Sequence, residues 1–185
     1  MNPRTSESHP MRIDFVEPLS APGKIGMTLC PGKHQDYGLS GKWRRDLALD
    51  IKSIIDTGAT VLVTLVESHE LDYLGVSDLG QQCQEAGLEW HHLPIEDQCA
   101  PDESFELLWA EVGEELRLSL RDGGVFVLHC MGGLGRTGTV AARLLVELGE
   151  SPESAIERVR DARRGAIETR VQEDYIGRCT PIAAE

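Results

Sequence analysis

The chain has 185 residues and a formal net charge of −13 at pH 7, so we expect one domain and neither nucleic acid nor anionic lipid as a partner. It has no run of about 18 apolar residues and no apolar core near its start, so neither a membrane span nor a signal peptide is predicted. Its five cysteines form no C-x-x-C pair, which argues against a disulfide framework or a metal site. We expect a cytoplasmic monomer without a cofactor.

In chain order, residues 1–10 are predicted to be a disordered tail and residues 11–180 a single folded domain. Strands are predicted where short apolar runs occur, at 12–16, 25–29, 60–66, 88–93 and 125–130. Helices are predicted where apolar residues recur every three to four positions, at 43–57, 76–86, 103–121, 137–148, 152–163 and 168–178. The first helix would begin with Arg44 and Arg45 on a solvated face. This alternation predicts an α/β fold with a mostly parallel central sheet flanked by helices.

The segment 129–138 reads His-Cys-Met-Gly-Gly-Leu-Gly-Arg-Thr-Gly and lies between an apolar strand and a helix start. A tight loop in that setting directs successive backbone N–H groups to one point, an arrangement that binds a phosphate dianion. Arg136 can complete this bowl with paired hydrogen bonds to two phosphoryl oxygens, which lysine cannot match. Cys130 lies at the floor, where the same positive potential favours a thiolate. The segment therefore predicts a site at which sulfur attacks phosphorus.

Each residue of this phosphate loop has a predicted role. The Cys130 thiolate forms a cysteinyl-phosphate, while the loop amides and Arg136 hold the equatorial oxygens. Thr137 offers its hydroxyl to the sulfur when sulfur leaves again. His129 is expected to orient the loop through hydrogen bonds. The alternative is that His129 is an ordinary core residue at the end of the strand. The backbone groups that surround the phosphate come from Met131, Gly132, Gly133, Leu134 and Gly135.

A general acid must protonate the departing oxygen, and the segment 93–102 is the natural source. It follows a predicted strand, and loops at the carboxyl ends of parallel strands gather at one edge of a sheet. Glu96, Asp97 and Asp102 compete for this role. Asp102 also fits the first turn of the next helix, and Glu96 fits a solvated position. We choose Asp97.

The pattern H-C-x5-R-[ST] resembles the signature of the cysteine-dependent protein phosphatases. With His-His-Leu-Pro-Ile-Glu-Asp at 91–97 and Arg-Arg-Gly-Ala-Ile-Glu-Thr at 163–169, the chain resembles the kinase-associated phosphatase family from about residue 30 to residue 176. Enzymes of that family dephosphorylate cyclin-dependent kinases. The resemblance implies a protein tyrosine phosphatase-like fold, Asp97 as the general acid, and Gln172 as the residue that positions the hydrolytic water. An ordinary place on a helix surface is the alternative for Gln172.

The substrate class follows from the loop's own charge. Enzymes of this superfamily that act on inositol phosphates tend to carry lysines inside the loop, and residues 131–135 contain none. We therefore expect a phosphorylated protein, carrying phosphotyrosine, phosphothreonine or phosphoserine. The alternatives are a small non-protein phosphate ester, a phosphate-binding module with little turnover, and a rhodanese-like sulfur carrier.

Two further features leave alternatives open. Arg163 and Arg164 either bind a second acidic group of the substrate or form a plain charge pair at a helix end. Cys99 either forms a reversible disulfide with Cys130 under oxidation or is an unrelated small residue. Where relatives have small residues and glycines, this chain has Glu96-Asp97-Gln98-Cys99, which bears on how the acid loop moves.

Overall fold

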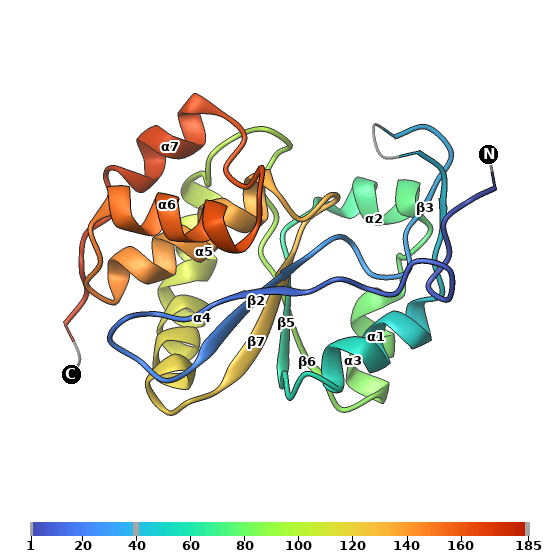
Figure 1. The fold of residues 1–185 in the computed structure, drawn as a ribbon, viewed down its shortest axis with the longest axis horizontal. Coiled ribbons are helices and arrows are strands. Elements are labelled where there is room, and N and C mark those ends of the chain that lie inside the picture. The colour runs from blue at the N-terminus through green and yellow to red at the C-terminus, as the bar shows by residue number, and fades with distance from the viewer. Residues whose placement is uncertain (1, 39–40, 184–185) are drawn as a thin grey trace.

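The computed structural model describes residues 2–38 and 41–183 and has a five-stranded sheet between two groups of helices (Figure 1). The strand order is β1-β2-β7-β5-β6; β1 is antiparallel to β2, and the other neighbours are parallel. The bounds are Asp14–Val16 for β1, Lys24–Thr28 for β2, Val61–Thr64 for β5, Glu89–His92 for β6 and Val125–His129 for β7. The predicted α/β fold with a mostly parallel central sheet is confirmed.

Helices cover both faces of this sheet (Figure 1). On one side lie α1 (Leu47–Ile55) and α3 (Leu79–Glu85); on the other lie α4 (Glu103–Arg121), α5 (Gly135–Glu147), α6 (Pro152–Ala162) and α7 (Arg170–Ile176). A short helix, α2 (Ser68–Leu74), follows β5, and a small hairpin joins β3 (His34–Gln35) to β4 (Trp43–Arg44). The α6 helix starts as predicted, because Ser151 accepts a hydrogen bond from Ser154 N and Pro152 is the first helical residue.

The strand register brings four strand ends into line. Thr64 pairs with His129 on one side and with His92 on the other, and His129 pairs with Thr28. The loops that follow β2, β5, β6 and β7 therefore leave the same edge of the sheet. This edge is where segments that are far apart in the sequence meet.

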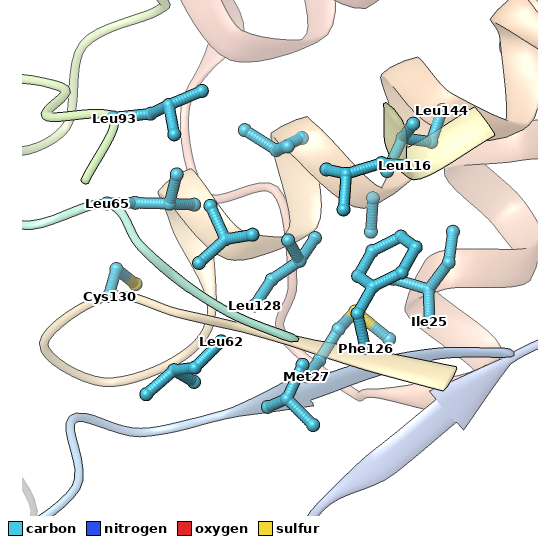
Figure 2. Close-up of a cluster of buried hydrophobic side chains, with 14 of the residues drawn as sticks. Ile25, Met27, Leu62, Leu65, Leu93, Leu116, Phe126, Leu128, Cys130 and Leu144 are labelled. Carbon is cyan, nitrogen blue, oxygen red and sulfur yellow. The ribbon is translucent and has the colours of Figure 1, made fainter. Parts of the chain in front are cut away.

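The core extends over both faces of the sheet, and on the α4–α5 side it reaches the phosphate loop (Figure 2). Phe126 and Leu128 of β7 are fully buried there with Leu144 of α5. Cys130 follows at the end of the same strand and is 4% exposed. A well-packed interior yields little, so the start of the loop is held rigidly by the core.

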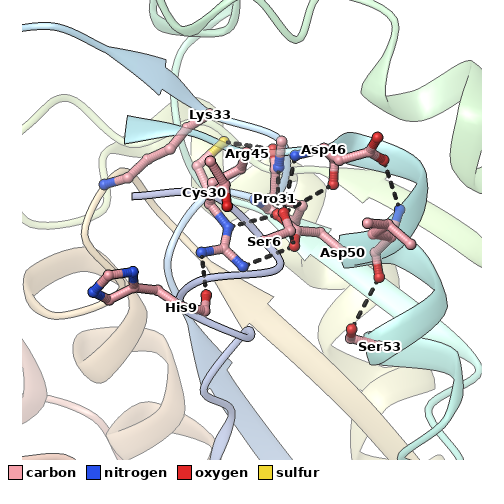
Figure 3. A network of polar contacts seen from close by, with 12 residues as sticks. Ser6, His9, Cys30, Pro31, Lys33, Arg45, Asp46, Asp50 and Ser53 are labelled. Atoms are coloured by element: carbon pink, nitrogen blue, oxygen red, sulfur yellow. Dashed lines mark hydrogen bonds and ion pairs between the residues drawn. The ribbon is translucent and has the colours of Figure 1, made fainter. Parts of the chain in front are cut away.

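The predicted disordered tail at residues 1–10 is a wrong prediction for the part of it that the structure describes; Met1 lies outside the described residues. Arg4 forms a backbone bridge with β4, its N–H donating to Lys42 O and its carbonyl accepting from β4. Ser6 Oγ donates to the Asp50 carboxylate over 2.8 Å (Figure 3). The composition of the segment is that of a tail, but these distant partners order it.

The helix predicted at 43–57 begins later than expected, at Leu47, because Trp43–Arg44 pairs with β3 as a strand. Asp46 caps the helix by accepting a hydrogen bond from Leu49 N. Arg45, expected in solvent, is buried and forms a two-bond ion pair with Asp50 over 2.7 and 2.8 Å. Tertiary pairing overrides the helical pattern of these residues.

Candidate active site

The phosphate loop runs from the end of β7 to the first turn of α5. Gly133 has a φ of +72°, and a Cβ there would lie 2.1 Å from Thr28 O, so the position requires glycine. Gly135 begins α5, and a Cβ there would lie 2.4 Å from a carboxylate oxygen of Glu168. The glycines therefore allow the loop to pass close to its neighbours and still reach a helix N-terminus, as the sequence pattern predicts.

Three consecutive carbonyl groups of the loop are held from outside by cationic side chains. Lys33 Nζ donates to Met131 O over 3.2 Å. The guanidinium of Arg163 donates to Gly132 O over 3.2 Å and to Gly133 O. Arg163 also forms an ion pair with Asp14 over 2.7 Å. It is buried against the loop and is not available to a second acidic group of a substrate, whereas Arg164 is exposed.

Arg136 extends from the first turn of α5 into a buried polar site and is 2% exposed. Its Nη1 and Nη2 atoms donate to the two carboxylate oxygens of Glu70 over 2.6 and 2.9 Å, and Nη1 also donates to Ile95 O over 3.0 Å. Glu70 was not predicted from the sequence. The only local signals for α2 are the Glu67–Glu70 capping box and the left-handed Gly75 that ends it.

Asp97 reaches the same arginine from the loop after β6. Its Oδ1 lies 3.1 Å from Arg136 Nη2, and the Asp97 side chain is 59% exposed. The competing Asp102 is instead the N-cap of α4 and accepts a hydrogen bond from Phe105 N over 2.9 Å. Glu96 is exposed. Of the three carboxylates, the structure thus brings Asp97 to the phosphate-loop arginine.

Two side chains of the α7 start hold the acid loop in place. Gln172 Nε2 donates to Cys99 O over 3.3 Å, and Thr169 Oγ1 donates to Gln98 O over 3.1 Å. Gln172 is fully buried, and its amide oxygen accepts from the backbone of Glu168 and Thr169. A Cβ at Gly135 would meet this amide at 3.1 Å, so Gln172 is not on a helix surface but beside the phosphate loop.

His129 links the loop to the sheet through a relay of hydrogen bonds. Trp90 Nε1 donates to Thr64 Oγ1 over 2.8 Å, so the Thr64 hydroxyl is free to donate to His129 Nε2 over 2.7 Å. The proton then belongs on His129 Nδ1, which lies 3.2 Å from Cys130 O. Burial lowers the pKa of His129 to about 4, so the ring is neutral at pH 7, as this relay requires.

The Thr137 hydroxyl is buried and, among the described residues, has no hydrogen-bond partner. An unpaired buried hydroxyl costs about 1–3 kcal/mol, and such groups call for an explanation. Thr137 follows Arg136 in the first turn of α5, the position for which a transient partner at the Cys130 sulfur is predicted.

Each of the five cysteines is a free thiol. Burial and the neighbouring Glu96 raise the pKa of Cys99. The sulfur that interacts electrostatically with Cys130 is that of Cys30, and burial raises the pKa of Cys30 well above its usual range. The Cys99–Cys130 disulfide stays a prediction.

Among the described residues, the group with metal-like spacing is Glu89, His91 and Glu115, whose ligand atoms lie within 4.8 Å of one another. His91 contacts both carboxylates over 3.0 and 3.5 Å, which accounts for the cluster without an ion. It includes none of the residues of the phosphate loop. Within the described ranges, no helix combines the length and the apolarity that crossing a membrane requires.

Comparison with known proteins assigns a family to this geometry. Residues 38–176 match the domain family described as "Swiss Army Knife protein, DSP-PTPase phosphatase domain". Cyclin-dependent kinase inhibitor 3 of Rattus norvegicus is 34% identical over 181 residues, covering 94% of this chain and 81% of the relative. The protein of that name from Homo sapiens is 32% identical over 180 residues, with the same coverage.

A solved structure of kinase associated phosphatase, in which the catalytic-site cysteine is replaced by serine, superposes with a TM-score of 0.79. It is 31% identical, and the match covers 90% of this chain and 92% of that one. PTPMT1 is 17% identical with a TM-score of 0.62, a likeness of fold.

Proposed function

The chain belongs to the dual-specificity protein phosphatase family and is a cysteine-dependent protein phosphatase. We propose that it dephosphorylates a protein kinase and that Cys130 carries the phosphoryl group during the reaction. The contact between Arg136 and Asp97 is the observation that best supports the proposed roles of these residues in catalysis. It places a carboxyl group 39 positions away in the sequence at the arginine that closes the phosphate loop.

In the first step, the Cys130 sulfur attacks phosphorus and the bond from phosphorus to the substrate oxygen breaks. Asp97, in its protonated form, gives its proton to that oxygen, because an unprotonated alkoxide leaves poorly. The loop amides and Arg136 hold the three equatorial oxygens. Glu70 binds the edge of the Arg136 guanidinium formed by Nη1 and Nη2, which fixes its plane. The edge formed by Nε and Nη2, where Asp97 contacts Nη2, is the one that would bind phosphate.

In the second step, a water molecule attacks phosphorus and the sulfur–phosphorus bond breaks. Asp97 takes the proton of this water, and the Thr137 hydroxyl donates to the departing sulfur. Gln172 lies beside Gly135 and positions the water. The products are inorganic phosphate and the free Cys130 thiolate, so the two steps close a cycle.

The substrate class rests on the relatives, which are named for association with kinases and for inhibition of cyclin-dependent kinases. The lysine-free phosphate loop and the net charge of −13 support a protein substrate over a polyanionic ring, a nucleic acid or an anionic membrane. We propose that the domain of residues 11–180 acts as a cytoplasmic monomer.

The test compares wild type and Cys130→Ser on para-nitrophenyl phosphate, phosphopeptides, a threonine-phosphorylated cyclin-dependent kinase and inositol phosphates. We expect the intact kinase to be preferred and a phosphorylated Cys130 to be trapped by rapid acid quench and mass spectrometry. Cys130→Ser should retain less than about one per cent of the activity, since a neutral hydroxyl is a weak nucleophile. A preference for inositol phosphates would overturn the proposal that a protein kinase is the substrate, and full activity of Cys130→Ser would overturn the mechanism.

A further inference from the structure

Lys33 lies outside the signature segment, in the loop after β2, yet its ammonium donates to Met131 O of the phosphate loop. Building on the proposed function, we infer that Lys33 is a positioning residue that orients the phosphate loop and supplies positive charge to the Cys130 sulfur. Lys33 is 2% exposed, which is rare for lysine, because a buried ammonium needs partners inside the protein.

The surroundings of Lys33 hold it in this place. Gly32, with a φ of +68°, donates its backbone N–H to Asp50 Oδ2 over 2.8 Å, and the same carboxylate is paired with Arg45. The Lys33 ammonium lies 4.9 Å from the ring centre of Trp43. Figure 3 shows the Lys33 side chain leading away from the Arg45–Asp50 ion pair, whose carboxylate accepts from the backbone of the preceding Gly32.

The contact with Met131 O affects the amides that would bind phosphate. In a trans peptide the C=O and the next N–H point in opposite directions. Lys33 Nζ and the backbone N–H of Cys30 both donate to the carbonyl of Met131, and Arg163 donates to those of Gly132 and Gly133. We therefore expect the N–H groups of residues 132–134 to point away from Lys33 and Arg163, toward the side where phosphate would bind.

The charge of Lys33 also acts on Cys130. The groups that interact with its ammonium are the sulfurs of Cys30 and Cys130 and the like charge of Arg45. Because burial raises the pKa of Cys30, that thiol stays neutral, and Cys130 is the sulfur on which the ammonium would act in the proposed mechanism. Burial also lowers the pKa of Lys33 to about 8, so the ammonium is present at pH 7 and is lost in mild alkali.

Lys33→Met keeps the apolar stem and removes the charge; Lys52→Met, in an exposed ion pair on α1, is the matched control. The first readout is sulfate binding to Cys130→Ser protein, because sulfate keeps its charge across this pH range and serine removes the sulfur of residue 130. We expect Lys33→Met to weaken sulfate binding at pH 7 about tenfold, as for one lost charge at short range. Binding to the Cys130→Ser parent should weaken as the pH rises through 8 and should not do so with Lys33→Met.

The second readout is alkylation of Cys130 by iodoacetamide at pH 6, followed by peptide mass spectrometry. Lys33→Met should slow this alkylation about tenfold, whereas Lys52→Met should not. Unchanged sulfate affinity and alkylation in Lys33→Met would overturn the proposal. If Lys33→Met fails to fold, Lys33→Gln, which also removes the charge, decides by the same two readouts. Neither readout requires hydrolysis, so a failure of the proposed phosphatase activity is recognised separately.

Discussion

Glu70 of α2 and Arg136 of α5 form a buried ion pair with two parallel hydrogen bonds, 66 positions apart in the sequence. Burial by itself raises the pKa of Glu70, but hydrogen bonds from Arg136 and from the Glu67 backbone outweigh it, and the net result is a lowered pKa. The carboxylate is therefore charged at neutral pH. The orientation of the phosphate-loop arginine depends on a residue from a different part of the chain.

Glu70→Gln should lower the free energy of unfolding at pH 7 by about 3 kcal/mol, because it leaves a buried guanidinium without its counter-charge. A carboxyl group with a lowered folded-state pKa stabilises the protein above its unfolded pKa of about 4.3, and the effect is lost as the pH falls. The difference between variant and wild type should therefore shrink below that pH. Urea unfolding at pH 7 and pH 3.5 measures it, with the exposed Glu157→Gln as control. A difference that does not change with pH would contradict the account.

Asp97→Ala should lower kcat on phosphopeptides by roughly 10²–10⁴, the span typical of a lost general acid. The loss should be smaller on para-nitrophenyl phosphate, whose leaving group needs less protonation. Asp102→Ala is the matched control, since it removes the N-cap of α4 and should cost about 1 kcal/mol of stability with little effect on kcat. The reverse result, with Asp102→Ala inactive and Asp97→Ala active, would move the acid to Asp102.

Thr137→Val should slow hydrolysis of the cysteinyl-phosphate without destabilising the fold, because the lost hydroxyl has no partner among the described residues. Pre-steady-state assays with para-nitrophenyl phosphate should then show a burst of product followed by slow turnover. Thr139→Val removes a hydroxyl that donates to Gly135 O over 2.7 Å. This control should lose about 1 kcal/mol of stability and show no burst. Equal kinetics in the two variants would exclude the proposed role of Thr137.

Between pH 7 and pH 5, the free energy of unfolding should fall by about 2 kcal/mol because of the protonation of His129 alone. Its folded-state pKa is about 4, so the unfolded chain takes up the proton first as the pH drops below about 6.5. His129→Gln should remove this part of the pH dependence, whereas the exposed His69→Gln should keep it. Urea unfolding at both pH values measures the slope, and an unchanged slope in His129→Gln would show that the imidazole is not buried as described.

The elements that the sequence predicted well have local signals. The predicted helix 103–121 matches α4 because its amphipathic pattern and its Asp102 cap lie within the helix itself. The strand 125–130 matches β7 to within one residue for the same reason. The seven-residue α2 helix was missed because its N-cap, Glu67, is not one of the residue types that mark a helix start. The ordering of residues 2–10 was missed because its partners lie about 40 positions away.

By itself, the sequence determined the phosphate loop, since Cys130, Arg136 and the glycines between them lie in one continuous strand–loop–helix segment. Its chemistry therefore depends on backbone geometry that neighbouring residues set. Only the tertiary structure decided which side chains surround that segment. Lys33 and Glu70 follow β2 and β5, which end at the same edge of the sheet as β7, and Arg163 ends α6, which packs against α5. Such contacts depend on long-range packing, which no short pattern records.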